Sequence, residues 1–135
     1  MLFVYNPPLR PSLRFLLRRT GARLAGIYVC PHDIDATCDC RKPRPGLLLR
    51  AAAEHGIDLP RSWMIGDSDS DVLAGRRAHC RTIRVGRDAG SGDAEAVPDL
   101  VAENLPRAVD LITTALTEAG GAPPACVRAE GRGGR

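Results

Sequence analysis

The chain has 135 residues, of which 44% are hydrophobic and 26% are charged, and its formal net charge at pH 7 is +3. This length and composition predict one soluble globular domain with a core of its own. The arginines are scattered and aromatic residues make up only 4% of the chain, so both the basic stripe and the base-stacking surface of a nucleic-acid partner are missing.

The first ten residues, MLFVYNPPLR, form a short apolar run that two prolines interrupt. The run is too short for the core of a signal peptide, and no stretch approaches the ~20 apolar residues that a membrane span needs. We therefore expect a cytoplasmic protein without a membrane partner.

Three elements are predicted next. Residues 10–23 (RPSLRFLLRRTGAR) place leucines at helical spacing with arginines on the other side, which indicates an amphipathic helix. Residues 23–30 (RLAGIYVC) predict a buried strand, and the polar residues 31–46 predict a loop.

A second helix is expected from Pro45 to Gly56, because proline suits a first helical turn and the segment is rich in helix formers. Residues 62–66 (SWMIG) have strand character, and DSDSDVLAGRRAH after them predicts a loop that turns into a helix. Residues 80–86 (CRTIRVG) predict another strand.

Residues 99–105 predict a last short strand and residues 106–120 a final amphipathic helix. The Gly- and Pro-rich end predicts disorder, so we expect a domain over 1–119 and a disordered tail over 120–135. Alternating strands and helices predict an α/β fold with a parallel sheet, where ligands bind at the carboxyl ends of the strands.

Cys30, His32, Cys38 and Cys40 form a C-x-H and a C-x-C pair with five residues between them. Four such ligands in a polar loop predict a closed tetrahedral Zn²⁺ site. Because four protein ligands leave no position for water, the metal would be structural. The alternative is a set of free or buried cysteines beside an incidental histidine.

Lys42 is the single lysine of the chain, beside 18 arginines. A lysine ammonium is a compact point charge that suits a phosphate oxygen or a carboxylate, whereas a guanidinium prefers bidentate partners. This difference favours a functional role for Lys42 over that of an ordinary surface lysine.

Asp67, Asp69 and Asp71 follow the apolar strand MIG. Carboxylates at the carboxyl end of a parallel strand are placed to bind Mg²⁺, and Asp67, nearest to the strand, is the predicted ligand. Helix capping and the helix dipole are the alternative, and they are expected to explain one of the three.

Residues 28–86, with zinc loop, lysine motif and acidic motif in this order, resemble the small zinc-loop phosphatases of the haloacid dehalogenase superfamily, which act on D-glycero-D-manno-heptose 1,7-bisphosphate or histidinol phosphate. The resemblance covers roughly residues 9–115. It implies a Rossmann-like three-layer α/β fold, Mg²⁺-dependent hydrolysis of a phosphate monoester through an aspartyl phosphate, and a monomer.

The resemblance assigns Cys30, His32, Cys38 and Cys40 to structural Zn²⁺. It assigns Lys42 to the substrate phosphate and the nucleophile, and Asp67 to Mg²⁺. It also implies that Arg41 contacts the substrate and leaves Asp71 as a supporting acidic residue. The substrate would be a phosphorylated sugar, because residues 56–75 look more like the heptose enzymes than like the histidinol-phosphate enzymes.

The sequence departs from this family in one respect, because its first aspartate is Asp33, whereas the family has its nucleophile on an N-terminal strand. Covalent transfer to a carboxylate needs that group. We therefore expect a domain that is incomplete at its N-terminus, in which MLFVYN replaces one of two missing strands. The alternatives are a non-catalytic, zinc-stabilised phosphate-binding descendant and a decayed fragment.

Overall fold

The structure is a computed structural model, and it describes residues 3–4, 24–33, 37–86 and 93–118. The elements of these residues are, in order, β1 (Phe3–Val4), β2 (Ile27–Tyr28), α2 (Gly46–His55), a 3₁₀ turn (Leu59–Arg61), β3 (Trp63–Gly66), α3 (Asp69–Arg77), β4 (Arg81–Val85), β5 (Leu100–Ala102) and α4 (Leu105–Glu118). The helix expected over 10–23 and the tail expected over 120–135 lie outside the described residues.

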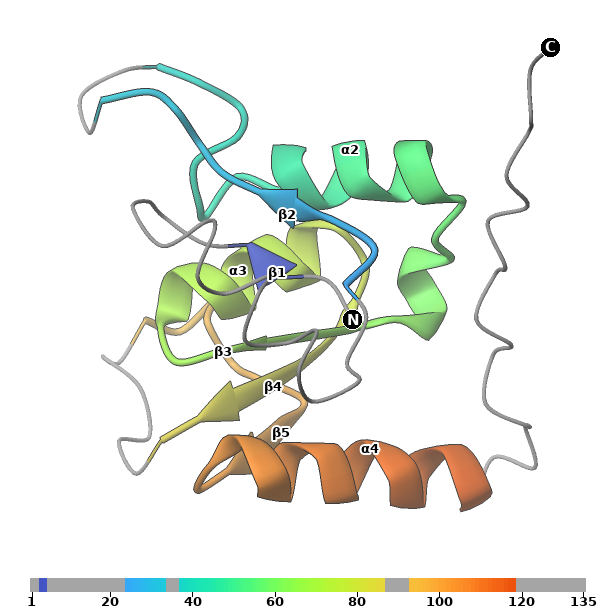
Figure 1. Cartoon of the computed structure of the whole chain (residues 1–135). Helices are drawn as coiled ribbons and strands as arrows, with labels where there is room; N and C mark the ends of the chain where they lie inside the picture. Colours follow the sequence, from blue (N-terminus) through green and yellow to red (C-terminus); the bar gives the residue numbers. More distant parts are fainter. Residues whose placement is uncertain (1–2, 5–23, 34–36, 87–92, 119–135) are drawn as a thin grey trace, which may run out of the picture.

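Strands β3, β4 and β5 form a parallel sheet in this order (Figure 1). In its register, Trp63 lies opposite Arg81 and Ile83 opposite Leu100. The predicted α/β fold with a parallel sheet is confirmed. Strands β1 and β2 pair in parallel as a separate ladder. Within the run expected as a strand over 23–30, the described residues form strand only at Ile27–Tyr28, which pair with Phe3–Val4.

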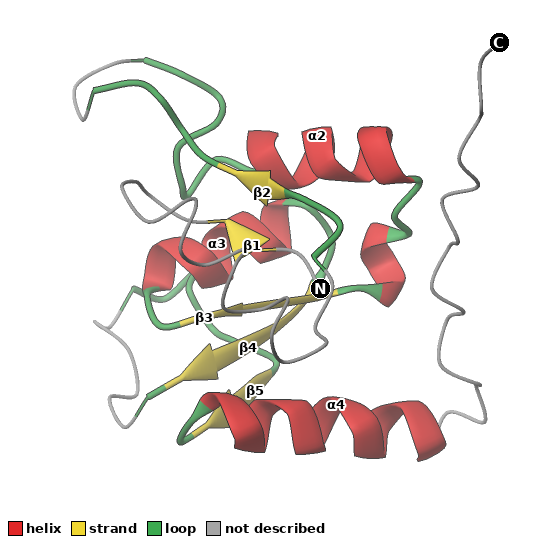
Figure 2. Cartoon of the chain, in the orientation of Figure 1, coloured by secondary structure: helices red, strands yellow, loops and turns green. Residues whose placement is uncertain are grey.

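Helices cover both faces of the three-stranded sheet. Since successive side chains of a strand point to opposite faces, each strand contributes residues to both contacts. Gly75 of α3 lies against Met64 and Thr82, which point to one face. The opposite face packs on Leu111 and Ile112 of α4. Its sheet residues are Trp63, Ile65, Ile83, Val85, Leu100 and Ala102. Figure 2 shows α4 on one side of the sheet and α3 with α2 on the other, which gives three layers.

The ends of the helices follow from capping residues. Gly56 ends α2 in the left-handed region with φ of 62°, and its N–H donates to the Ala52 carbonyl, as the predicted boundary requires. Ser68 is the N-cap of α3 with extended backbone. At the start of α4 the Asn104 side chain accepts a 2.9 Å hydrogen bond from the Arg107 backbone N–H.

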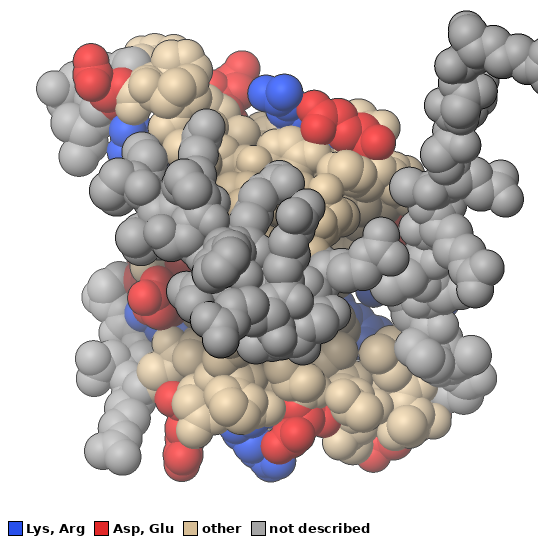
Figure 3. Space-filling model, in the orientation of Figure 1, with Lys and Arg blue, Asp and Glu red and all other residues tan. Residues whose placement is uncertain are grey.

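Helix α2 connects the sheet to the loop that precedes it. Its Leu48 packs with Ala74, Ala78 and Cys80, a cluster that Met64 of β3 also contacts. Leu47 and Ala51 of the same helix pack with Tyr28 of β2. None of the helices in the described part of the chain combines the length and the apolar character of a membrane span. On the face shown in Figure 3, acidic and basic side chains are interspersed.

Candidate functional site

The four predicted zinc ligands come together in the loop between β2 and α2, where their ligand atoms lie within 4.8 Å of one another. The Sγ of Cys40 lies 3.1 Å from that of Cys30 and 3.4 Å from that of Cys38. The Cys30 and Cys38 sulfurs are 3.6 Å apart, and His32 Nδ1 is 3.1 Å from the Cys40 sulfur.

These distances are close to those of a tetrahedral zinc site. With Zn–S bonds of about 2.3 Å, the sulfurs of such a site are about 3.8 Å apart. Each of the three sulfur pairs would have to separate by less than ~1 Å to reach this value. Three thiols and one imidazole are also the ligand types that Zn²⁺ prefers, so the residues fit the metal.

The thiols of the cluster influence one another's ionisation. Partial burial acts to raise the pKa of Cys38, but hydrogen bonds from Cys40 and Cys30 outweigh it and lower that pKa to about 7. The hydrogen bond with Cys30, together with burial, raises the pKa of Cys40 to about 12. Ionisation of Cys38 is therefore favoured over that of Cys40, and a bound divalent cation would favour the thiolate form of both.

The loop is shaped by backbone contacts that need a particular residue at each point. The Gly46 N–H donates a 3.0 Å hydrogen bond to the Asp39 carbonyl. A Cβ on Gly46 would collide with that carbonyl group, so glycine is required at the start of α2. Cys30 and Cys40 also pack against the buried cluster of Tyr28, Leu47 and Ala51. These contacts hold the loop of the four predicted zinc ligands, here called the metal loop, against α2.

Lys42 lies just after this loop and forms an ion pair with Asp71 of α3. The Asp71 side chain is 5% exposed, whereas that of Lys42 is 35% exposed and so remains accessible. The second carboxylate oxygen of Asp71 accepts hydrogen bonds from the Ser68 hydroxyl at 2.7 Å and the Ser68 backbone N–H at 3.3 Å. Asp71 thus pairs with Lys42 through one carboxylate oxygen and completes the N-terminal cap of α3 through the other.

The Asp71 carboxylate is stabilised in its charged form. Burial alone would raise the pKa of Asp71, but the hydrogen bonds from Lys42 and Ser68 outweigh it and hold that pKa below its usual value. Gly66 makes this arrangement possible, because a Cβ on Gly66 would overlap the Asp71 side chain. The end of β3 and the first turn of α3 can therefore approach each other closely.

The other two aspartates of the acidic motif have different surroundings. Asp67 is exposed directly after β3 and forms no salt bridge with any residue that the structure describes. Asp69 pairs with Arg84 of β4, whose side chain is 9% exposed. Asp67 is therefore the exposed carboxylate of this motif, and it has no ion-pair partner in the described part of the chain.

The predicted substrate residue Arg41 points to the metal loop. Its Nη2 donates a 2.6 Å hydrogen bond to the His32 carbonyl. Arg84 and Ser68 were not predicted from the sequence. The serine could have been identified as a helix N-cap before an acidic first turn, whereas nothing local distinguishes an arginine inside a strand.

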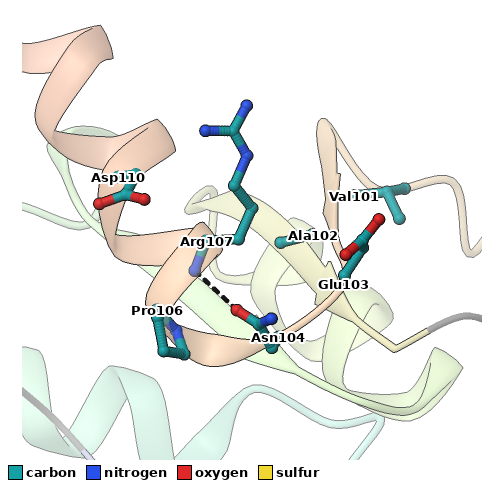
Figure 4. A pocket seen from close by; sticks show the side chains of 7 residues that line it. All are labelled: Val101, Ala102, Glu103, Asn104, Pro106, Arg107 and Asp110. Atoms are coloured by element: carbon teal, nitrogen blue, oxygen red, sulfur yellow. Dashed lines mark hydrogen bonds between the residues drawn. The ribbon is translucent and has the colours of Figure 1, made fainter.

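A cavity of about 500 Å³ lies elsewhere, between the carboxyl end of β5 and the start of α4 (Figure 4). It contains none of the predicted site residues. Its lining consists of Val101, Ala102, Glu103, Asn104, Pro106, Arg107 and Asp110.

The chain is similar in sequence to one protein family and to known phosphatases. Residues 39–108 match the model of the HAD-hydrolase-like family. The chain is 56% identical over 63 residues to a D-glycero-beta-D-manno-heptose-1,7-bisphosphate 7-phosphatase of Helicobacter pylori strain J99, an alignment that covers 47% of this chain and 36% of the relative. It is 42% identical over 95 residues to the enzyme of the same name from Photorhabdus laumondii, covering 63% of this chain and 50% of that one.

The fold also matches a solved structure, that of D,D-heptose 1,7-bisphosphate phosphatase from B. bronchiseptica in complex with magnesium and phosphate. The TM-score is 0.67 and the identity 26%, and the match covers 87% of this chain and 74% of the other. The chain spans about half or less of the length of the two curated relatives.

Proposed function

The chain belongs to the HAD-hydrolase-like family, and we propose that it supplies the lysine and the magnesium-binding aspartate of a phosphatase site for D-glycero-manno-heptose 1,7-bisphosphate. The observation that carries this proposal is the ion pair of Lys42 with Asp71, whose helix begins directly after the turn that carries Asp67. This arrangement combines a partly exposed ammonium, the buried carboxylate that holds it, and an exposed carboxylate at the end of β3.

Asp67 is the proposed Mg²⁺ ligand. Mg²⁺ takes oxygen ligands, and one or two carboxylates with waters and substrate phosphate are sufficient to hold it. Asp69 and Asp71 are committed to Arg84 and Lys42, which leaves Asp67 as the carboxylate available to the ion. Bound Mg²⁺ would contribute positive charge against the phosphate oxygens.

Lys42 is proposed to bind the transferred phosphate. Its ammonium is held by Asp71 in a fixed position, so it requires little rearrangement when negative charge develops on the phosphoryl oxygens. This role also explains why lysine stands here in a chain that otherwise uses arginine, because a compact ammonium fits between a carboxylate and a phosphate oxygen.

Zn²⁺ is the proposed occupant of the Cys30, His32, Cys38 and Cys40 cluster. Four protein ligands close its coordination, so the metal would stabilise the loop and take no part in the reaction. Lys42 lies two positions after Cys40. A stable loop would therefore also fix the start of the turn that carries Lys42, here called the lysine turn.

The relatives' names support heptose 1,7-bisphosphate as the substrate, and histidinol phosphate is the competing one. The second candidate function is phosphate binding without turnover, because Lys42 and an Mg²⁺ held by Asp67 would bind phosphate whether or not a carboxylate nucleophile is present.

The test is phosphate release by the full 135-residue chain with Mg²⁺, on heptose 1,7-bisphosphate and on histidinol phosphate. Titration calorimetry with inorganic phosphate and Mg²⁺ accompanies it. We expect Asp67→Asn to reduce Mg²⁺-dependent phosphate binding or turnover at least 100-fold. The exposed Asp110→Asn on α4 serves as the charge-matched control and should leave both unchanged.

The outcomes separate the two functions. Turnover of the heptose substrate that depends on Asp67 supports the phosphatase, and Mg²⁺-dependent phosphate binding without turnover supports the binding function. A chain that is folded by circular dichroism but neither binds phosphate nor releases it contradicts both.

A further inference from the structure

We propose that Arg84 is a positioning residue that ties the turn carrying Asp67 to β4, and so holds the Asp67 carboxylate where Mg²⁺ is proposed to bind. This turn, residues 67–69, is here called the acidic turn. The inference rests on the proposed function for the role of Asp67. Its readout is the binding of a divalent cation, which can be measured without turnover.

The place of Arg84 in the sheet is the first argument. In the register of β3 and β4, Arg84 lies opposite Gly66, the residue that directly precedes Asp67. The Arg84 side chain forms an ion pair with Asp69, the first residue of α3. One residue of β4 is thus linked to the chain both before and after Asp67, through the strand pairing and through the ion pair.

The close approach of α3 to the ends of the strands makes this contact possible. Side chains two positions apart on a strand share a face, so Arg84 lies on the same face as Thr82, which packs against α3 at Gly75. On the neighbouring strand, Gly66 has no side chain and leaves room for the first turn of α3. The Arg84 guanidinium therefore lies beside the start of the helix, where it meets Asp69.

The burial of this arginine is the second argument. Arg84 is 7% exposed and is the one buried residue among the basic residues that the structure describes. The N-terminus of a helix carries a partial positive charge, so a cation beside it is unfavourable unless a carboxylate compensates it. Apolar residues in place of a buried ion pair often give equal or greater stability. The pair with Asp69 is therefore better explained by the geometry that it fixes than by the stability that it adds.

A second ion pair holds the chain just after the acidic turn. Asp71 pairs with Lys42 of the lysine turn and completes the N-terminal cap of α3. The start of α3 is thus held from β4 by Arg84 and from the lysine turn by Lys42, while Asp67 remains the exposed carboxylate. Loss of Arg84 would release the support from β4 and leave the other in place.

The experiment removes the ion pair without changing the net charge, by Arg84→Met together with Asp69→Asn in the full chain. The matched control, Arg50→Met with Glu54→Gln, removes the exposed ion pair of α2. Mn²⁺ takes oxygen ligands as Mg²⁺ does, and it serves as the probe in the presence of inorganic phosphate. Its affinity is measured together with its electron paramagnetic resonance spectrum, which reports the symmetry of the ligand set.

We expect the double variant of Arg84 and Asp69 to bind Mn²⁺ about 10-fold more weakly and with an altered spectrum, because groups that orient a metal ligand typically change affinity by about 10- to 100-fold. Binding of inorganic phosphate without a divalent cation, which is proposed to depend on Lys42, should stay unchanged in a phosphorus NMR titration. A general loss of structure would weaken both. The control pair should leave both unchanged.

Mn²⁺ binding that is as strong in the double variant as in the unchanged chain, or stronger, overturns the inference. An equal loss of phosphate binding without the cation overturns it as well. If the unchanged chain binds no Mn²⁺, or binds it independently of Asp67, the proposed metal site and this inference are both wrong. A lack of phosphate release bears on the proposed turnover alone.

If the double variant is not folded by circular dichroism, Arg84→Lys decides. Lysine keeps the positive charge but lacks the planar fork of the guanidinium, so it should hold Asp69 less firmly and weaken Mn²⁺ binding. An affinity and a spectrum equal to those of the unchanged chain would overturn the positioning role.

Discussion

Asp67, Asp69 and Asp71 alternate in the sequence, yet each has a different environment in the fold. Asp67 is exposed, Asp69 pairs with Arg84, and Asp71 pairs with Lys42. The two committed carboxylates neutralise buried or half-buried cations, and both lie in the first turn of α3, where negative charge also complements the helix dipole. The motif thus places three identical residues in three environments, and the ligand-binding role that we propose belongs to the exposed one, Asp67.

The pair of Asp71 and Lys42 leads to a prediction about pH. Because the folded pKa of Asp71 is lowered, its contribution to stability is complete above the unfolded value of about 4 and is lost as the pH falls through the folded pKa. Asp71→Asn should lower the free energy of unfolding by about 2 kcal/mol at pH 7, an amount discounted for the partial exposure of Lys42.

The measurement is urea unfolding of both proteins at several pH values. The stability difference between them should shrink below about pH 4, because the carboxylate of the unchanged chain becomes protonated there. Asp110→Asn controls for removal of an exposed charge and should show a small, constant difference. A difference for Asp71→Asn that stays constant down to pH 2 would contradict the ion pair.

At the scale of single residues, part of the candidate site could be predicted from the sequence. The four proposed zinc ligands could be grouped because they lie within eleven residues, and Lys42 was distinctive as the single lysine. The partners of Lys42 and Asp69 could not be predicted, since they lie 29 and 15 positions away and depend on how α3 packs on the sheet. Likewise, only the folded loop shows that Arg41 contacts the His32 carbonyl.

At the scale of elements, α3 and the sheet are in unusually close contact through Gly75. A Cβ at this position would lie 2.7 Å from the Met64 Cβ and 2.8 Å from the Thr82 Cγ2. Glycine weakens a helix, so its presence in the middle of α3 reflects the packing against β3 and β4. This contact holds the acidic turn and the lysine partner at the end of β3.

Gly75→Ala should therefore destabilise the chain, although alanine is the better helix former. The gain in helix propensity is about 1 kcal/mol, whereas overpacking costs about 1–3 kcal/mol, and with so close a contact we expect a net loss of about 1 kcal/mol or more. Thermal unfolding followed by circular dichroism measures it. A rise in the unfolding temperature would show that the helix has room to move away from the sheet.

Gly56→Ala provides the comparison. A Cβ there would meet no atom within 4 Å, but the left-handed backbone, with φ of 62°, disfavours alanine. Its cost of about 1–2 kcal/mol should come from the backbone, so it should leave the Mg²⁺-dependent binding unchanged.

Most elements could be predicted from the sequence because periodicity and capping are local. The helix of Gly46–His55 ended at Gly56 as expected, and β3, β4 and β5 lie where their apolar runs predicted. Strand length could not be predicted in the same way. The run at residues 23–30 became a strand of two residues, because ladder length depends on the partner strand.

On the scale of the whole molecule, α2 contacts both the metal loop and the helix α3 that packs on the sheet. One of its buried sides packs on Tyr28 and on two cysteines of the metal loop, and Leu48 packs on the cluster that contains α3 residues. Distortion of the loop would therefore reach the sheet through α2 and through Lys42. We expect zinc to stabilise the entire chain and not the loop alone.

Zinc removal tests this coupling. Zinc at about 100 times its dissociation constant should stabilise the fold by about 2.7 kcal/mol, or roughly 10–20 °C in the unfolding temperature. Treatment with a chelator should lower the midpoint by this amount in the unchanged chain and in Cys80→Ala, whose thiol is buried away from the cluster. In Cys38→Ser, chelation should have a much smaller effect. An unfolding temperature that does not depend on zinc would contradict the coupling.

The difference in sequence separation between the two parts of the site has a consequence for synthesis on the ribosome. The cysteine and histidine ligands are complete within eleven residues, whereas the partner of Lys42 follows 29 positions after it. At about 5–20 residues per second, Asp71 is added roughly 1.5–6 s after the lysine. The proposed zinc ligands are thus all synthesised before the helix residue that pairs with Lys42. We expect zinc that is supplied during translation to raise the yield of correctly folded protein.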